Sequence, residues 1–344
     1  MFSHLRVQPC FFVHFGYTNS SGLILFAEMK NMQKDTQHLP KLVVILGPTA
    51  SGKTGLSLTL AKKFNGEIIS ADSRQIFKKM NIGTAKPKGE WRWNGLRKTF
   101  FVEDIPHHLI DFLDPGKVFT VAEFRDKALK YTKMAYQAGR VPIIVGGTGL
   151  YISSVVDNYI IPRVNQNPKL RASLSEKSNE ELLALLENLD PEAVKIIDVA
   201  NQRRIIRALE VCILSGERFS KQRKKGDELF NVLQIGIDIS REDLYRRINE
   251  RTEKMMEDGL LGEAQSLLKQ KYGWNLSSMN SIGYKQLRGY FEKTLDLDQT
   301  LEMLKRDTRH FAKRQITWFK RDKRINWCVS EEQAVALVGK FLQE

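Results

Sequence analysis

The sequence has few cysteines, since Cys10, Cys212 and Cys328 are the only three among 344 residues. They lie far apart, and none belongs to a Cys-x-x-Cys pair. A sparse and odd number argues against a disulfide framework and against a cysteine zinc site. Such usage is typical of a reducing compartment, so we expect a cytoplasmic protein.

Long apolar runs are also missing from the sequence. No run reaches the ~18 residues that a membrane-spanning helix requires, so no membrane association is expected. The apolar pieces within residues 1–40 are interrupted by polar residues and make a poor signal peptide. We expect this segment to be a tail that can be disordered, with Met29 or Met32 as alternative starts of the folded chain.

Positive charge, in contrast, is abundant and clustered, and the formal net charge is +14. Residues 203–225 carry a net charge of +6, and residues 305–324 carry a net charge of +7. A single basic cluster is usually a solvated helix face. Two clusters that hold nearly the whole excess favour binding to a polyanion, such as nucleic acid.

Short apolar runs alternate with helical patterns in the first half of the chain. We predict helices over 53–64 and 118–138, and strands over 41–46, 67–70, 141–145 and 232–239. Thr120 and Glu123 form a capping-box signature at the start of the second helix, and Gly139 marks its end. Strands that alternate with helices predict an α/β fold, in which helices flank a parallel sheet on both faces.

The stretch from residue 165 to residue 225 interrupts this alternation. It holds helical patterns and no strand pattern, and the helices are predicted over 180–188, 192–197 and 203–214. After Ile239 the pattern is almost wholly helical, with main elements over 244–256, 262–269 and 300–320. We therefore predict a P-loop α/β core over 41–164 and 229–344, with a helical C-terminal region, and an all-helical insertion domain over 165–228.

The segment from Gly47 to Thr54 matches the phosphate-binding loop (P-loop) pattern G-x-x-x-x-G-K-[ST]. It follows a predicted strand and opens a predicted helix, which is the context that this loop requires. Backbone N–H groups of such a loop surround phosphate oxygens, the Lys53 ammonium adds charge, and the Thr54 hydroxyl can bind Mg²⁺. The alternative is a chance match in a glycine-rich turn.

The loop alone does not name a reaction. Nucleotide triphosphatases and kinases often carry an Asp at the end of a later apolar strand. Here the strand predicted over 141–145 continues into Gly146, Gly147 and Thr148 without an Asp, which counts against ATP hydrolysis.

Further motifs follow the P-loop in order. They are ISADSRQIF (69–77), IGTAKP (82–87), HHLID (107–111), GGTGLY (146–151), RALEV (207–211), IGYK (282–285) and KRQITW (313–318). Each motif is weak alone, but the ordered set closely resembles the tRNA dimethylallyltransferase family, also called tRNA isopentenyltransferases. The resemblance extends from about Leu42 to about Trp327.

The resemblance implies a prenyltransferase that moves a dimethylallyl group from dimethylallyl diphosphate to N6 of the adenosine at tRNA position 37, next to the anticodon. The products are N6-isopentenyladenosine and diphosphate. Mg²⁺, bound through the Thr54 hydroxyl, is the implied cofactor, and the tRNA anticodon stem-loop is the implied partner of a monomer. The leaving diphosphate would be bound by Gly47, Pro48, Thr49, Ala50, Ser51, Gly52, Lys53 and Thr54.

The resemblance also implies four catalytic residues, namely Asp72, Thr148, Lys53 and Arg251. Asp72 matches the general base for the weakly nucleophilic N6, and its alternative role is to cap a following helix. Thr148 matches the residue that contacts the acceptor base, and it could instead cap the next helix. Arg251 matches the arginine that meets the diphosphate, and its alternative is a surface arginine paired with Glu250 or Asp258.

Positions that match tRNA-contacting residues of the family are spread along the chain. They are Asp72, Ser73, Arg74, Gln75, Thr148, Arg171, Arg203, Arg204, Ile205, Ile206, Arg207, Asn280, Ser281, Ile282, Gly283, Tyr284, Lys285, Lys313, Arg314, Gln315, Ile316, Thr317, Trp318, Phe319 and Lys320. Independently of the resemblance, helical spacing places Arg306, Arg309, Lys313 and Lys320 on one stripe that could follow phosphates. Trp318 and Phe319 can pack or stack.

The sequence departs from the family pattern in places. Phe77 replaces a Tyr, Asn81 replaces an Asp, and residues 88–102, with Trp91 and Trp93, form a long insert without a functional explanation. We find no Cys/His zinc finger of the kind that many eukaryotic members have, and therefore expect a bacterial-type enzyme.

Three other functions stay open. The first is a small-molecule P-loop kinase, in which Arg203, Arg204 and Arg207 would close over ATP. The second is a relative that prenylates free adenine nucleotides, and the third is an RNA-binding protein with an inactive loop. The two basic segments argue for a macromolecular acceptor.

Overall fold

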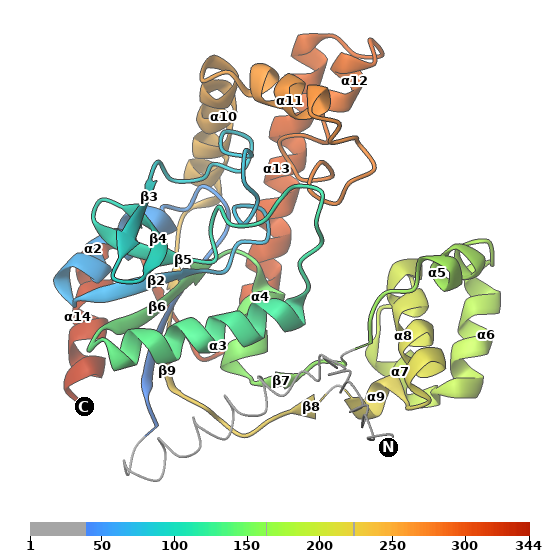
Figure 1. Ribbon diagram of the computed structural model, residues 1–344, viewed down its shortest axis with the longest axis horizontal. Helices are drawn as coiled ribbons and strands as arrows, with labels where there is room; N and C mark the ends of the chain where they lie inside the picture. The colour runs from blue at the N-terminus through green and yellow to red at the C-terminus, as the bar shows by residue number, and fades with distance from the viewer. Residues whose placement is uncertain (1–38, 163, 223) are drawn as a thin grey trace, which may run out of the picture. The chain divides into compact units, whose positions relative to one another are not determined.

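The computed structural model describes residues 39–162, 164–222 and 224–344, so nearly all of the predicted tail lies outside the described residues. Its core is an eight-stranded sheet in the order β10-β9-β1-β6-β2-β5-β4-β3 (Figure 1). The strands are β1 (Lys41–Leu46), β2 (Gly66–Ser70), β3 (Glu90–Asn94), β4 (Arg97–Val102), β5 (Ile105–His108), β6 (Val141–Gly146), β9 (Asn231–Ile237) and β10 (Ile325–Cys328). Neighbours from β10 to β5 are parallel, whereas β4 and β3 extend the sheet in antiparallel fashion.

Helices cover both faces of this sheet (Figure 1). One face carries α2 (Lys53–Lys63) and α14 (Glu331–Gln343), and the other carries α3 (Val121–Gln137) and α4 (Gly149–Val156). The C-terminal region adds α10 (Arg241–Glu257), α11 (Leu260–Lys269), α12 (Leu287–Phe291) and α13 (Leu297–Phe319). Within the described residues, no helix has the length and apolar character needed to cross a bilayer.

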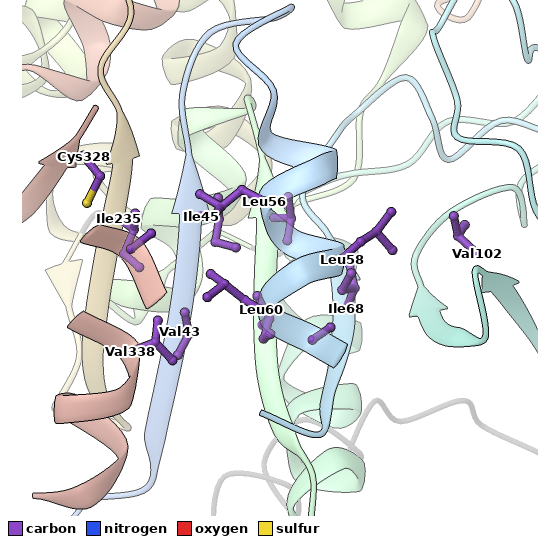
Figure 2. Close-up of a cluster of buried hydrophobic side chains, with 14 of the residues drawn as sticks. Val43, Ile45, Leu56, Leu58, Leu60, Ile68, Val102, Ile235, Cys328 and Val338 are labelled. Atoms are coloured by element: carbon purple, nitrogen blue, oxygen red, sulfur yellow. The ribbon is translucent and has the colours of Figure 1, made fainter. Parts of the chain in front are cut away.

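The core sequence of β1 explains why the sheet is covered on both sides. Successive strand residues point to opposite faces. Val43 and Ile45 pack with Leu60 of α2 and Val338 of α14 (Figure 2). The alternate residues of the strand, Leu42 among them, are also fully buried. Full burial of one such side chain contributes ~1.5–3 kcal/mol, so the continuous apolar run specifies a central strand.

The predicted strands and helices of the core are confirmed within a few residues at each end. Thr120 caps α3, with reciprocal bonds to Glu123, and Gly139 follows that helix at φ 65°. The expectation of a wholly parallel sheet is wrong for β3 and β4, which form a hairpin from the unexplained insert 88–102. Strands β5 and β10 were not predicted, because each has only four residues and β5 reads Ile-Pro-His-His.

The helical segment predicted over 165–228 contains α5 (Pro168–Ser175), α6 (Asn179–Leu189), α7 (Pro191–Ile196), α8 (Gln202–Ser215) and α9 (Phe219–Gln222). These helices share a hydrophobic cluster that includes Leu182, Leu186, Ile205 and Leu209. The chain enters and leaves through a short antiparallel pair, β7 (Tyr159–Ile160) with β8 (Lys224–Lys225). The sequence pattern missed α5, α9 and these two-residue strands.

Candidate active site

Two open cavities lie at the carboxyl ends of the central strands. The first, here called the P-loop cavity, has a volume of about 630 Å³ and is lined by Thr49, Lys53 and Thr54 of the loop. The second, the α13 cavity, has a volume of about 670 Å³ and is lined by Arg314 and Trp318 of α13, among others. The two cavities adjoin and share eight of their lining residues, namely Thr49, Asp72, Thr84, Ala85, Gly147, Arg251, Phe311 and Gln315.

The loop from Gly47 to Thr54 connects β1 to the first turn of α2. Gly52 has φ 99°, a left-handed conformation that a residue with a Cβ rarely adopts, and it directly precedes the helix. The Lys53 ammonium folds back over the loop and donates to the Pro48 carbonyl at 2.5 Å. The positive end of α2 and the Lys53 charge therefore both face the P-loop cavity.

Asp72 follows β2 and lines both cavities. Its Oδ1 accepts hydrogen bonds from the backbone N–H groups of Arg74, at 2.8 Å, and Gln75, at 3.3 Å. Residues 73–76 form a turn rather than a helix, so the helix-cap alternative does not apply. The carboxylate thus stabilises a turn with one oxygen while it lines the wall between the cavities.

Thr148 stands at the N-cap position of α4, but its side chain makes no capping hydrogen bond. Instead, Thr148 Oγ1 accepts a hydrogen bond from the Ser73 backbone N–H at 3.1 Å. The capping alternative is therefore wrong for this side chain. The bond holds the turn after β6 against the turn that carries Asp72.

Arg251 reaches across from α10 and donates to Thr49 Oγ1 at 2.5 Å. Its surface-pairing alternative is wrong, because Glu250 pairs with Arg246 and Asp258 pairs with Lys254.

Lys53, Asp72 and Arg251 lie close enough for their charges to interact. Burial lowers the pKa of Lys53 to about 8, while Asp72 opposes this shift and Arg251 adds to it. Burial likewise lowers the pKa of Arg251, and Asp72 opposes that shift. The three groups are therefore electrostatic neighbours, two cations around one carboxylate.

Gln315 and Trp318 on α13 meet the glycines of the GGTG motif. Gln315 Nε2 donates to the Gly147 carbonyl at 2.8 Å. A Cβ placed on Gly147 would lie 2.2 Å from Gln315 Nε2, and a Cβ on Gly149 would lie 2.2 Å from Trp318 Nε1. These two positions require glycine because the α13 side chains occupy the space, so the GGTG and KRQITW motifs are two sides of one contact.

The IGTAKP loop, which also lines the cavities, is held by Glu263 of α11. The Glu263 carboxylate accepts hydrogen bonds from the backbone N–H groups of residues 81–83, at 2.7–3.1 Å, and from Tyr284 Oη at 2.5 Å. A Cβ on Gly83 would lie 2.5 Å from the Tyr284 ring. The sequence pattern gave no sign of Glu263, because its backbone partners lie about 180 residues earlier in the chain.

Lys86 secures the other end of the same loop. Its buried ammonium donates to Phe77 O, to Asn81 Oδ1 at 2.9 Å and to Asp111 Oδ1 at 2.6 Å. Asn81, which departs from the family's Asp, thus still accepts a hydrogen bond. Phe77, the other departure, is buried in a cluster with Leu260 and Leu267 of α11.

The predicted tRNA-contacting residues differ in exposure. Those with exposed side chains are Asn280, Lys285, Lys313, Arg314, Thr317, Trp318 and Lys320, together with Arg203 and Arg204 in α8. Those that are buried are Ile205, Ile206, Ser281, Gly283, Tyr284, Gln315 and Phe319. The others, Asp72, Ser73, Arg74, Gln75, Thr148, Arg171, Arg207, Ile282 and Ile316, are partly buried. Of these buried residues, Gln315 and Gly283 still line the α13 cavity, whereas Ile205, Ile206 and Tyr284 pack in hydrophobic clusters.

The basic stripe predicted on α13 is not uniform. The Arg309 guanidinium donates to Asn249 Oδ1 of α10 at 2.7 Å, so this member faces the neighbouring helix. Arg314, one residue beyond Lys313, lines the α13 cavity instead.

Arg171 and Arg207 in the helical insertion line neither cavity. Both bind the fully buried carboxylate of Glu210, with one bond of 2.7 Å from each guanidinium. Burial would raise the pKa of Glu210, but the bonds from Arg171, the Asn167 backbone and Arg207 outweigh it and lower the pKa to about 2. The two arginines thus have a structural role within the insertion.

Mg²⁺, the cofactor that the resemblance implies, fits the P-loop cavity. The Thr54 side chain is exposed, lines this cavity and forms no hydrogen bond with the described residues. No cluster of three or more His, Cys, Asp or Glu residues occurs within 39–162, 164–222 and 224–344. Mg²⁺ commonly takes few protein ligands and shares substrate phosphate oxygens, so a single hydroxyl beside a phosphate site suits it.

The protein therefore has an α/β fold with two adjoining cavities. One is formed by the P-loop, and the other is lined by basic residues of α13 and its neighbours. A family model described as IPP transferase matches residues 75–322, and one described as isopentenyl transferase matches residues 40–107. The chain belongs to the IPP transferase family, which confirms the resemblance drawn from the motifs.

Individual relatives agree with this assignment. A tRNA dimethylallyltransferase of Carboxydothermus hydrogenoformans is 43% identical over 302 residues, which cover 86% of this chain and 94% of the relative. The structure of a tRNA delta(2)-isopentenylpyrophosphate transferase from Staphylococcus epidermidis has a TM-score of 0.63 at 38% identity, and covers 88% of this chain and 99% of that chain. A tRNA isopentenylpyrophosphate transferase from Bacillus halodurans has the same TM-score at 35% identity, with 88% and 95% covered.

Proposed function

We propose that this protein transfers a dimethylallyl group from dimethylallyl diphosphate to N6 of the adenosine at tRNA position 37. The observation that carries the proposal is the wall at Asp72, where the P-loop cavity and the α13 cavity meet. A transfer between a diphosphate donor and a nucleic-acid acceptor needs two adjoining sites, because the reacting atoms must approach to about 3–3.5 Å. The small-molecule kinase alternative is not favoured, since the relatives are dimethylallyltransferases.

The P-loop cavity suits a donor with a charged end and an apolar end. Lys53, Arg251 and the N-terminus of α2 provide positive charge. Ile68, Ile110 and Val145 provide an apolar surface in the same cavity. The diphosphate would lie on the loop, and the five-carbon chain would extend along the apolar side.

The α13 cavity suits the acceptor. Arg314 and Lys285 can meet phosphates, and Trp318 offers an exposed aromatic face on which a base can stack. An adenine must leave its stack to reach an enclosed reaction site, and the loop of an RNA hairpin makes this easier. The exposed Arg203 and Arg204 of the helical insertion are further candidates for RNA contacts.

Asp72 is the proposed base. As the adenine N6 attacks the first carbon of the donor, the bond from this carbon to the diphosphate oxygen breaks and an N6 proton passes to the Asp72 carboxylate. Lys53 and Arg251 offset the charge that develops on the departing diphosphate. Thr148 holds the turn beside Asp72 and lines the acceptor side.

Mg²⁺, bound by Thr54 and the diphosphate oxygens, would supply further neutralisation of the leaving group. We further propose that the enzyme works as a monomer in the cytoplasm.

Labelled dimethylallyl diphosphate, tRNA and the purified full chain provide the direct test. We expect label in tRNA, and N6-isopentenyladenosine in the digested nucleosides identified by mass spectrometry. Phosphorylation of a metabolite by ATP, without label in tRNA, would overturn the proposal. Label in free adenine nucleotides but not in tRNA would show that the acceptor is a small molecule and not tRNA.

A further inference from the structure

Helix α10 presents a row of cations to the P-loop cavity. Arg247, Arg251 and Lys254 are spaced four and three residues apart, which places them on one helical face. All three line the P-loop cavity. The family resemblance implies a role for Arg251 alone, although the sequence shows the other two at helical spacing from it.

Arg247 reaches the loop itself. A Cβ placed on Gly52, the last residue before α2, would lie 3.8 Å from Arg247 Nη1. The guanidinium therefore lies over the turn at which the loop passes into the helix, one residue from Lys53. This is the end of α2 at which an anion is best stabilised by the helix dipole.

The partners of the neighbouring cations set Arg247 apart. Arg246 pairs with Asp243 at 3.0 Å and with Glu250 at 3.1 Å, and Lys254 pairs with Asp258 at 3.2 Å. Arg251 donates to Thr49. Among the described residues, no carboxylate oxygen lies within 4.0 Å of the Arg247 guanidinium, whose side chain is exposed at the rim of the cavity.

We propose that Arg247 is a third cationic contact of the leaving diphosphate, beside Lys53 and Arg251. The inference rests on the proposed function, in which the P-loop cavity binds the diphosphate of the donor. A guanidinium presents a planar pair of donors that matches two phosphate oxygens, and such charge-assisted pairs are about twice as strong as neutral hydrogen bonds. Because no described carboxylate forms an ion pair with Arg247, although Asp243 acts on it from a longer distance, an arriving diphosphate meets a guanidinium that is free to pair with it.

Binding of inorganic diphosphate, measured by calorimetry on the full chain with Mg²⁺ present, separates this role from a structural one. We expect Arg247→Ala to raise the dissociation constant of diphosphate by roughly 10- to 100-fold, the range of one charge-assisted pair. Arg247→Lys should recover part of the loss, because it keeps the charge without the fork. The matched control is Arg246→Ala on the next residue, which should change the constant less than about twofold.

Affinity for tRNA should stay unchanged in the Arg247 variants. The KM for dimethylallyl diphosphate should rise in parallel with the dissociation constant of inorganic diphosphate. If Arg247→Ala binds diphosphate as Arg246→Ala does, while Lys53→Ala loses binding, Arg247 is not a diphosphate contact and the proposed function stands. If Lys53→Ala also leaves diphosphate binding unchanged, the P-loop cavity is not the diphosphate site and both proposals fail.

Discussion

Gln315 Oε1 accepts a hydrogen bond from the backbone N–H of Thr49 at 2.8 Å, across 266 positions of sequence. The same amide donates to the Gly147 carbonyl at 2.8 Å. One side chain of α13 therefore joins the P-loop to the turn that carries Thr148, in the wall between the two cavities.

Replacement of Gln315 by Ala leaves the Thr49 N–H and the Gly147 carbonyl without this partner. We expect the single-turnover rate of transfer to fall ~10- to 100-fold, because small displacements between the two reacting groups are costly. Affinity for tRNA should change little. Gln315→Glu should retain the hydrogen bond from Thr49 and lose the one to Gly147. Its single-turnover rate should therefore lie between those of the wild type and Gln315→Ala. A loss of tRNA affinity with a normal single-turnover rate would show that Gln315 is an RNA contact after all.

Asp72→Asn is a sharp test of the base, because an Asn oxygen can still accept the turn bonds from Arg74 and Gln75. We expect transfer to fall by about 10²–10⁴, the usual contribution of a positioned base. Binding of tRNA, measured by filter retention, should be kept. Asp72→Ala should lose transfer too, with an added loss of stability from the open turn. Transfer at the wild-type rate in Asp72→Asn would remove Asp72 from the mechanism.

Lys53 should give the donor affinity a distinctive pH dependence, because burial lowers its pKa to about 8 in the free protein. Above this pH the neutral amine no longer attracts phosphate. The dissociation constant of dimethylallyl diphosphate should therefore be lowest below pH 8 and rise as the pH increases beyond it.

The free energy of unfolding should increase with pH over the range in which donor affinity decreases. Because the unfolded chain keeps Lys53 protonated up to a higher pH, the free energy of unfolding should increase between pH 8 and the normal lysine value. Lys53→Arg, which stays charged, should show neither break. A flat affinity profile from pH 7 to 10 in the wild type would contradict this reading.

Arg314 and Lys313 are neighbours on α13 with different surroundings. Arg314 lines the α13 cavity, so Arg314→Ala should weaken tRNA binding and lower the salt slope by about one unit. Lys313→Ala should have the same effect only if the RNA extends beyond the cavity. Lys340→Ala on α14, also exposed, is the control and should leave the slope unchanged. Binding titrations at several salt concentrations measure all three.

Glu210 should make the helical insertion sensitive to acid. Its folded pKa of about 2 lies below the normal value, so its stabilising effect is full at neutral pH and is lost as the pH falls through that range. In Glu210→Gln this pH-dependent part should vanish, and stability at pH 7 should drop because Arg171 and Arg207 lose their common partner. Thermal melts at pH 2–7 followed by circular dichroism test the difference. Parallel wild-type and variant profiles would show that the carboxylate is not linked to folding.

Local signals were sufficient to predict β1, the P-loop, α2 and the capping box at Thr120. They failed at β5 and β10, whose four residues carry no periodic pattern of their own and gain strand structure from their neighbours. The position of Gln315 illustrates a second limit. Its match to an RNA contact came from the motif, whereas its burial and its bond to Thr49 depend on how α13 packs, which no local pattern reveals.

The motifs proposed roles for Asp72 and Arg251, but the alternatives could be decided only from the structure: the turn at residues 73–76 excludes the helix cap for Asp72, and the ion pairs of Glu250 and Asp258 exclude surface pairing for Arg251. Arg247 is the converse case. Its spacing from Arg251 can be read from the sequence, but the absence of an ion pair to Arg247 within the described part of the chain appears only once Arg246, Glu250 and Asp243 have been placed.

The β3–β4 hairpin occupies one edge of the sheet. At its tip, a Cβ on Gly95 would meet no atom of the described residues within 4 Å, and Leu96 is 97% exposed. Only the inner strand contributes to the interior, through Phe100 and Val102. Such tips tolerate added sequence because no buried backbone is disturbed. For protein engineering, this makes the tip the natural attachment point for a fluorophore or an affinity handle, because it lines neither the P-loop cavity nor the α13 cavity.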